Sequence, residues 1–255
     1  KISMPSHPSN KHTPKGSVLQ HLIELRGRIL KILFVIVVAL LLLMPFSNEL
    51  YTLLAQPLID NLPGQGSMVA IDVASPFLAP FKLVLVLSII LTIPFTLYHA
   101  WVFIAPGLYE NEKKLAQPVF ISSVLLFYLG MLFAYFVVFP LIFAFFVNTA
   151  PTGVAVMTDI SRFLDFVIKI FFAFGIAFEV PIVTIVLVKL GVTDPNRLAS
   201  KRPYIIVAAF VIGMLLTPPD VISQILLAIP IWLLFEVGLF FAKLIHKKDS
   251  KKHDI

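Results

Sequence analysis

The chain has 255 residues, of which 59% are hydrophobic and only 13% are charged. Soluble domains keep about a quarter of their residues charged, so this balance excludes an ordinary soluble protein and indicates a membrane protein. The chain has no cysteine, which excludes disulfides, thiol catalysis and thiolate metal sites. The net charge of +6 could suggest a nucleic-acid partner, but its placement along the chain favours membrane topology instead.

The first part of the chain predicts a tail, two spanning helices and a surface segment between them. Residues 1–16 contain three prolines and a glycine and predict a flexible tail. A helix is expected to follow and to continue into the first span, at 29–46. A surface helix at 49–62 and the sequence DVASPF (72–77) come next and lead into the second span, at 81–104.

Four further apolar stretches predict four more spans. They lie at 118–147, 163–188, 204–216 and 221–242. The fifth holds only thirteen apolar residues, between Pro203 and Thr217. That is about 20 Å of helix, well short of the ~30 Å hydrocarbon core. We expect the fifth and sixth spans to form a short hairpin that thins the bilayer and packs behind longer helices.

Six spans place both termini on one side of the membrane, and the basic residues indicate which side. The two tails and two of the loops hold 17 of the 20 Lys and Arg residues, leaving Lys82, Arg162 and Lys169 for the other face. Positive charge is retained on the cytoplasmic side, so both termini are predicted to be cytoplasmic. We therefore expect one membrane domain, 17–243, followed by a basic cytoplasmic tail, 244–255.

Glu24 lies among basic residues directly before the first span, in the sequence LQHLIELRGR (19–28). An acid there contributes little to orientation, so it needs another explanation. One interpretation is a surface pair with Arg28, four residues on along a helix. The other is a carboxylate that accepts the planar guanidinium of an arginine in a cationic peptide.

The predicted loop 103–114 carries two more acids, Glu110 and Glu112. It could be an ordinary solvated loop between two spans. It is expected on the same membrane face as Glu24, so two carboxylates converging there could hold two adjacent cationic side chains.

Glu179 lies within the predicted fourth span. A carboxyl among apolar residues in a membrane is costly and marks a functional or water-lined site by default. The alternative is a protonated Glu hydrogen-bonded inside the bundle. Thr217, Asp220 and Gln224 lie near the tip of the short hairpin, where they could be turn and capping residues only.

Catalytic patterns are missing from the sequence. It contains no HExxH, no GxSxG and no P-loop, and its histidines are terminal or isolated. We therefore predict a protein that is not an enzyme and has no metal centre or cofactor. A proton-coupled small-solute transporter using Glu179 is the main alternative, although no repeat relates the two halves of the chain.

Six motifs in chain order resemble the TatC family, the core receptor subunit of the twin-arginine protein translocase. They are HLIELRGR, DVASPF, FIAPGLYENEK, FEVP, KRPY and GMLLTPPDVISQ. The resemblance extends over about 17–243. It implies a curved, glove-like bundle of six helices in the bacterial inner membrane. It also implies recognition of twin-arginine signal peptides on folded cargo, and export with TatB and TatA driven by the proton-motive force.

The resemblance also implies roles for individual residues. Signal-peptide binding falls to Glu24 and Glu112, with Phe103 beside them and Arg26 supporting the geometry. Glu179 corresponds to the intramembrane Glu of the concave face. The positions that contact the single-span partners are Met214, Thr217 and Gln224, and the outer-face positions tied to structure or activity are Pro57, Asp72 and Asp220. Other TatC copies and membrane lipids are further expected partners.

Overall fold

The protein is all-helical throughout the part of the chain that the structure, a computed structural model, describes. The described residues are 15–60, 68–104, 110–149, 157–217 and 221–253, with side chains left out at 15–22, 100–104, 110–116 and 248–253. Extended pairing in these ranges is limited to one isolated bridge between Val69 and Asp159. The predicted all-α class is therefore confirmed.

The helices follow one another closely along the chain. In order they are α1 (Lys15–Leu43), the 3₁₀ turn η1 (Met44–Phe46), α2 (Ser47–Ile59), α3 (Ser75–Leu91), α4 (Ile93–Ile104), α5 (Glu110–Phe133), the π-helical turn η3 (Ala134–Val138), α6 (Phe139–Asn148), α7 (Ile160–Ala177), α8 (Val180–Lys189), α9 (Pro195–Ala199), α10 (Arg202–Leu216) and α11 (Val221–His253).

Several of these helices are long and apolar enough to cross a membrane. Among the described residues, four stretches meet that condition: Ile23–Ile59, Gln117–Asn148, Ile160–Lys189 and Val221–Lys247. A fifth consists of α3 and most of α4, which are bent by 46° at a short break. The apolar helix α10 has 15 residues, about 22 Å, and is too short to cross ~30 Å alone.

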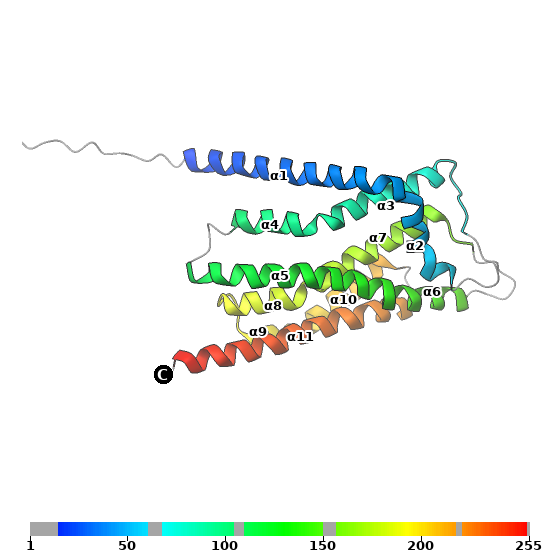
Figure 1. The fold of residues 1–255 in the computed structure, drawn as a ribbon. Coiled ribbons are helices and arrows are strands. Elements are labelled where there is room, and N and C mark those ends of the chain that lie inside the picture. Colours follow the sequence, from blue (N-terminus) through cyan, green and yellow to red (C-terminus); the bar gives the residue numbers. More distant parts are fainter. Residues whose placement is uncertain (1–14, 61–67, 105–109, 150–156, 218–220, 254–255) are drawn as a thin grey trace, which may run out of the picture.

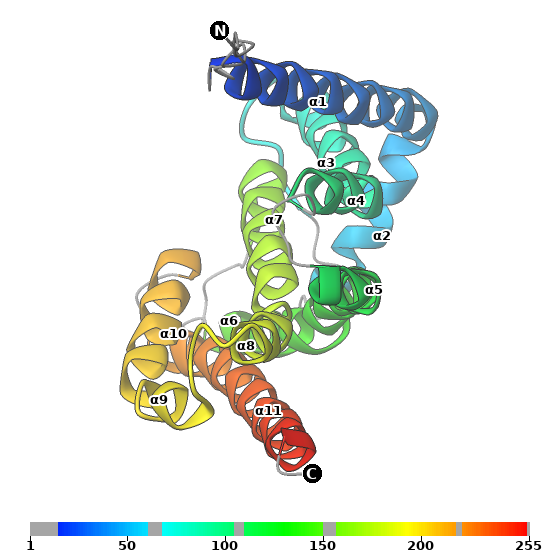
Figure 2. The same cartoon turned by 90° about the vertical axis from the view of Figure 1, so that its left-hand side faces the viewer.

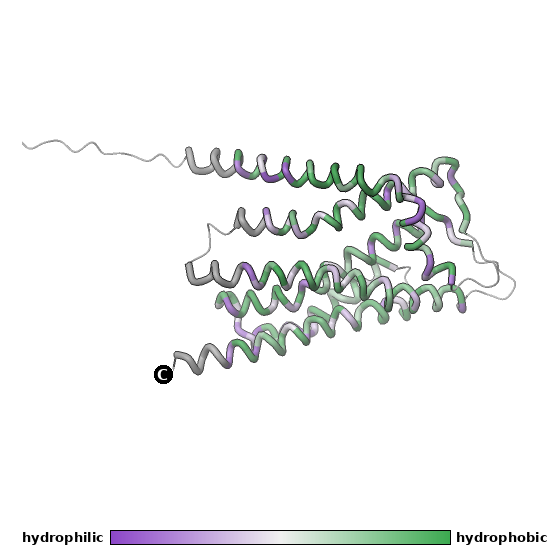
Figure 3. Tube along the Cα trace, viewed as in Figure 1, coloured by the Kyte–Doolittle hydropathy of each residue, from purple (hydrophilic) through white to green (hydrophobic). Residues whose placement is uncertain are grey.

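The long helices lie side by side with their ends aligned (Figure 1). We call the end where α1 begins and α11 ends the terminal end; α4 ends and α5 begins there too. The other end, which carries α2 and the starts of α3 and α7, is the opposite end. Seen along the helices, α1 and α11 lie at the two edges and α7 lies between them (Figure 2). Hydrophobic residues fill the middle of the bundle, while hydrophilic ones gather toward its ends (Figure 3).

Prolines divide two of the predicted spans. The second becomes α3 and α4 around Pro94, and the fourth becomes α7 and α8 just before Pro181. Proline has no N–H, so the carbonyl four residues earlier loses its helical donor and the helix bends or breaks. By contrast, α11 continues through Pro230.

The core is built largely from phenylalanine where the α5–η3–α6 stretch packs on α7. Phe139 and Phe174 are fully buried, and the ring centroids of Phe139 and Phe171 are 5.2 Å apart. Aromatic rings in tilted contact fill this space without any polar group that would need a partner. The helix pair at the centre of the bundle is therefore held by close packing.

Candidate functional site

Glu24 lies on α1 near the terminal end, and its side chain is 47% exposed. Its carboxylate oxygen Oε1 accepts a hydrogen bond from Nε of Arg28 at 3.1 Å and a second from Nη2 of the same guanidinium. The i,i+4 pair predicted from the spacing is thus present. The carboxylate stays accessible to water in this pair, so the pairing is compatible with binding a further cation.

Arg28 connects this acid to a second helix. Its Nη1 donates to the backbone carbonyl of His99 on α4 at 3.5 Å. Glu24 on α1 is therefore coupled through one guanidinium to α4, whose last turn carries Phe103. Arg26 lies between Glu24 and Arg28 in sequence and is exposed.

The acids of the predicted loop 103–114 lie in a helix. We expected a loop through Lys114, but α5 begins at Glu110, so Glu110 and Glu112 are in its first turn. Acidic residues there are favoured by the partial positive charge at a helix N-terminus. The start of α5 lies at the terminal end, as does the start of α1, the helix that carries Glu24 (Figure 1). The side chains of Phe103, Glu110 and Glu112 fall outside the described residues.

Glu179 occupies the junction between α7 and α8. Its side chain is half-buried, and the Ser123 hydroxyl of α5 is close enough to interact with the carboxyl. The Oε1 atom is buried without a hydrogen bond to any described residue. This junction lies well inside the predicted fourth span. Glu179 therefore lies where the helix is interrupted, and not within a continuous helix.

The α10–α11 hairpin brings together two of the three residues predicted to contact the partner subunits. Met214, which is 51% exposed, and Gln224 line a shallow apolar hollow of about 280 Å³ along α10. Thr217 instead is buried, and its hydroxyl donates to the Gly213 carbonyl at 3.0 Å. It closes the end of α10, as a capping residue does. Asp220 lies outside the described residues.

Two of the predicted outer-face residues lie at the opposite end of the bundle. Pro57 is inside α2. Asp72 is exposed just before α3, and its carbonyl accepts the Ser75 N–H at 3.1 Å. Neither residue is near the Glu24 end, so the predicted residues fall into separate groups along the bundle.

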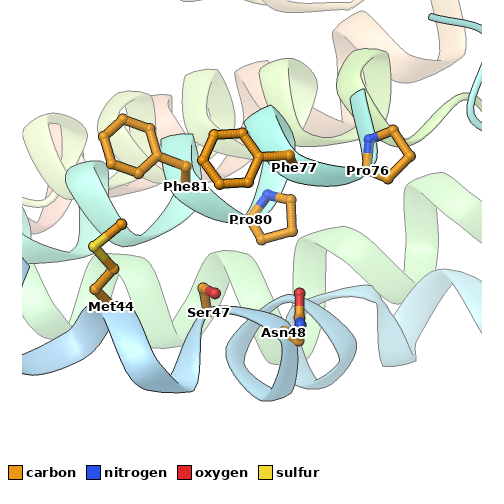
Figure 4. A pocket seen from close by; sticks show the side chains of 7 residues that line it. All are labelled: Met44, Ser47, Asn48, Pro76, Phe77, Pro80 and Phe81. Atoms are coloured by element: carbon orange, nitrogen blue, oxygen red, sulfur yellow. The ribbon is translucent and has the colours of Figure 1, made fainter. Parts of the chain in front are cut away.

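A hollow of about 320 Å³ opens at the same opposite end, between the α1–α2 junction and α3 (Figure 4). Its lining is mostly apolar: Met44, Ser47, Asn48, Pro76, Phe77, Pro80 and Phe81. This lining includes none of the residues predicted to be functional.

Comparison with known proteins agrees with this architecture. The family described as "Sec-independent protein translocase protein (TatC)" matches residues 20–230. A TatC of Azotobacter chroococcum is 52% identical over 238 residues, which cover 93% of each chain. One from Escherichia coli K12 is 52% identical over 237 residues, covering 93% of this chain and 92% of its own. The chain belongs to the TatC family.

A solved relative confirms the fold of this TatC-family chain. The crystal structure of a twin-arginine translocase receptor TatC matches with a TM-score of 0.76 at 39% identity. The match covers 88% of this chain and 98% of the other. The protein is therefore a multi-pass membrane component of the Sec-independent translocase, and the resemblance drawn from the sequence is confirmed.

The sequence analysis missed a cluster of hydrogen bonds that joins α2, the segment before α3 and the start of α7 at the opposite end of this TatC-family fold. Asp159 caps α7 by accepting the N–H groups of Ser161 and Arg162, and it also accepts that of Ile71 from the segment before α3. The Tyr51 hydroxyl of α2 donates to the next carbonyl, that of Ile160, at 2.9 Å. The sequence DIS before an apolar run is an N-cap pattern that could have revealed Asp159.

Two ion pairs between helices were also missed. Arg202 at the start of α10 binds Glu236 of α11 through two bonds of 2.6 and 2.8 Å, a bidentate pair at the base of the hairpin. Lys82 of α3 pairs with Asp165 of α7. These partners are 34 and 83 residues apart, so no local spacing predicts them.

Proposed function

We propose that this TatC-family protein is the receptor of the twin-arginine translocation system. It binds the paired arginines of signal peptides on folded proteins at Glu24 and Glu112, with Phe103 beside them and Arg26 supporting the geometry. The observation that carries the proposal is the accessible Glu24 carboxylate on the part of α1 that lies at the same end of the bundle as the start of α5.

The physical basis is a pair of carboxylates on a cytoplasmic surface that is otherwise basic. That surface attracts anionic lipid headgroups and repels most cationic peptides. Two carboxylates there admit a peptide with two adjacent arginines. The planar guanidinium fork bonds a carboxylate through two donors, which a lysine ammonium does not.

The proposed topology has six spans, with α10 as the short fifth and both termini in the cytoplasm of a bacterium. Residues 17–243 form the glove-like membrane domain in the inner membrane, between tails at 1–16 and 244–255. Export with TatB and TatA uses the proton-motive force. The placement of basic residues and the shared end of α1 and α11 support this arrangement.

The other predicted residues receive proposed roles in the same mechanism. Glu179 faces the path of the apolar part of the signal peptide. The hairpin positions Met214, Thr217 and Gln224 contact TatB and TatA. The positions Pro57, Asp72 and Asp220 support the outer face, and other TatC copies and lipids surround the bundle.

The clamp is tested by measuring how tightly a labelled twin-arginine peptide binds to the purified protein and to variants at positions 24 and 112. We expect Glu24→Gln and Glu112→Gln each to weaken peptide binding about tenfold or more, because each removes a charged acceptor of a bidentate bond. Glu49→Gln, an exposed acid of α2 at the opposite end, is the matched control and should bind normally.

A second control separates the clamp from the Glu24–Arg28 pair. Arg28→Gln removes the pair but keeps the Glu24 carboxylate, so it should reduce binding much less than Glu24→Gln. Normal peptide binding by both glutamate variants, or equal losses in Glu24→Gln and Arg28→Gln, contradicts the clamp.

A further inference from the structure

Two tyrosines of the α5–η3 stretch donate hydrogen bonds to the backbones of other helices. The Tyr128 hydroxyl donates to the carbonyl of Ile90 in α3 at 2.9 Å. The Tyr135 hydroxyl, seven residues further on, donates to the carbonyl of Leu53 in α2 at 2.8 Å. A carbonyl inside a regular helix already accepts an N–H from four residues on, so two such bonds need an explanation.

Proline supplies it in both cases. Pro94 comes four residues after Ile90, and Pro57 comes four residues after Leu53. Neither proline has an N–H to give, so each carbonyl lacks its helical donor. At Ile90, which is buried within the predicted second span, an unpaired carbonyl is costly because water does not replace the missing donor. Each tyrosine hydroxyl takes the place of one missing N–H.

At Pro94 the tyrosine hydroxyl replaces the missing N–H at a bend of 46° between α3 and α4. The Thr92 hydroxyl donates to the carbonyls of Ser88 and Ile89. The next two carbonyls, those of Ile90 and Leu91, face the Tyr128 hydroxyl at 2.9 and 3.4 Å. Thr92 is part of the bend and moves with it. Tyr128 comes from α5, so its bond fixes the direction of the bend relative to the rest of the bundle.

The direction of this bend sets the position of α4. That helix carries the His99 carbonyl that Arg28 contacts, and Arg28 in turn holds Glu24. It also leads to Phe103 and, across 105–109, to the start of α5. A hinge at Pro94 that was free to turn would move the end of α4 relative to α1.

We propose that Tyr128 is a positioning residue for the signal-peptide site. By bonding the Ile90 carbonyl, which Pro94 leaves without its helical donor, it holds α4 at a fixed angle against the Glu24–Arg28 pair on α1. The inference rests on the proposed function in that the end of α4 is taken as part of the site. The coupling of Tyr128 to the angle of α4 does not depend on what binds there.

Tyr135 offers a matched control within the same chain. Tyr135→Phe also removes a single tyrosine hydroxyl, and that hydroxyl bonds a carbonyl, that of Leu53, which a proline likewise leaves without its helical donor. Its bond is to α2, at the opposite end, where no part of α4 lies. Both variants should destabilise the protein, but only Tyr128→Phe should disturb the terminal end.

The angle of α4 is measured directly by electron–electron double resonance. The chain has no cysteine, so spin labels attach only at introduced ones, Tyr98→Cys on α4 and Leu244→Cys on α11. Both positions are about half exposed, and α11 lies beyond α5 and α8 from α4 (Figure 1). We expect Tyr128→Phe to broaden or shift this distance distribution and to weaken twin-arginine peptide binding about fivefold. Tyr135→Phe should leave both unchanged.

A proline cycle supplies the second test. Pro94→Ala gives Ile90 a backbone donor, so adding Tyr128→Phe to Pro94→Ala should lower the melting temperature much less than Tyr128→Phe does in the native background. The inference is overturned if Tyr128→Phe leaves the distance distribution unchanged, or if Tyr135→Phe changes that distribution equally. It is also overturned if Tyr128→Phe lowers the melting temperature equally in the native and the Pro94→Ala backgrounds. If the unaltered protein fails to bind the peptide, the proposed function is wrong, and the distance measurement still decides the role of Tyr128.

Discussion

Gly130→Ala is expected to lower the free energy of unfolding by about 2 kcal/mol or more. Gly130 lies where α5 meets α7, and an added Cβ would be 2.5 Å from the Phe174 carbonyl oxygen and 3.0 Å from the Phe178 ring. A backbone oxygen inside a helix cannot rotate away, so the two helices would have to separate. Small residues at such crossings let membrane helices pack closely. Thermal unfolding in detergent measures the loss.

Other glycines of the chain provide controls. Gly238→Ala should be similarly costly, because its Cβ would lie 2.6 Å from the Pro181 Cα. Gly175→Ala meets only the Phe127 ring, which can turn, so a smaller loss is expected. Gly27 on α1 has nothing within 4 Å of the added atom, and Gly27→Ala should be neutral or slightly stabilising. Equal stability of Gly130→Ala and Gly27→Ala would show that the α5–α7 contact is loose.

Asp159→Ala is expected to have the second large effect, a fall in melting temperature of roughly 5 °C. The substitution removes the N-cap of α7 and also leaves the Ile71 N–H without its acceptor. The segment before α3 would then be held less firmly to α7, by the bonds of Val69 with Thr158 and Ile160 and by the bond between the Ser161 and Ser75 hydroxyls at the start of α3. Asp165→Ala is the control: it removes an exposed acid of the same helix and its surface ion pair with Lys82, and it should cost much less.

The same carboxylate predicts how stability depends on pH. Hydrogen bonds from the Arg162 and Ile71 N–H groups, with a further one from Ser161, hold the pKa of Asp159 below its ordinary value of 3.8. A carboxyl whose pKa is lower in the folded state stabilises that state fully above its unfolded pKa. The contribution is lost as pH falls through the folded pKa.

The difference in melting temperature between the native protein and Asp159→Asn should therefore be constant above about pH 5 and shrink below pH 4. A difference that stays constant down to pH 2 would show that the ionised carboxylate is not what holds α7 to the segment before α3.

The ion pair of Glu24 and the contact of Arg28 with α4 show how far local spacing reaches. Glu24 and Arg28 are four residues apart on one helix, so the sequence predicted their contact. Arg28 and the His99 carbonyl are 71 residues apart, and nothing in either segment indicates the contact. The sequence therefore predicted an acid near the membrane surface but not the helix to which it is joined.

The prolines also show which features follow from the sequence and which follow only from the fold. Pro94 and Pro181 could be located in the predicted spans, and loss of an N–H follows from the residue type alone. Which group replaces that N–H depends on a side chain brought near by folding, as with Tyr128, which is 38 residues from Ile90. Glu110 and Glu112 were assigned to a loop because charged residues between two spans are typical of one, yet the helix extends to include them.

The sequence by itself determined the membrane class, the apolar stretches, the asymmetry of basic residues and, through its motifs, the TatC family. These properties depend on the transfer of side chains between water and lipid and on residue order, which need no knowledge of neighbours. Only the tertiary structure decided that Gly130 is a close crossing and Gly27 is not, that Asp159 joins two segments, and that Tyr128 completes the bend at Pro94. Each of these depends on distances between groups far apart along the chain, which packing alone sets.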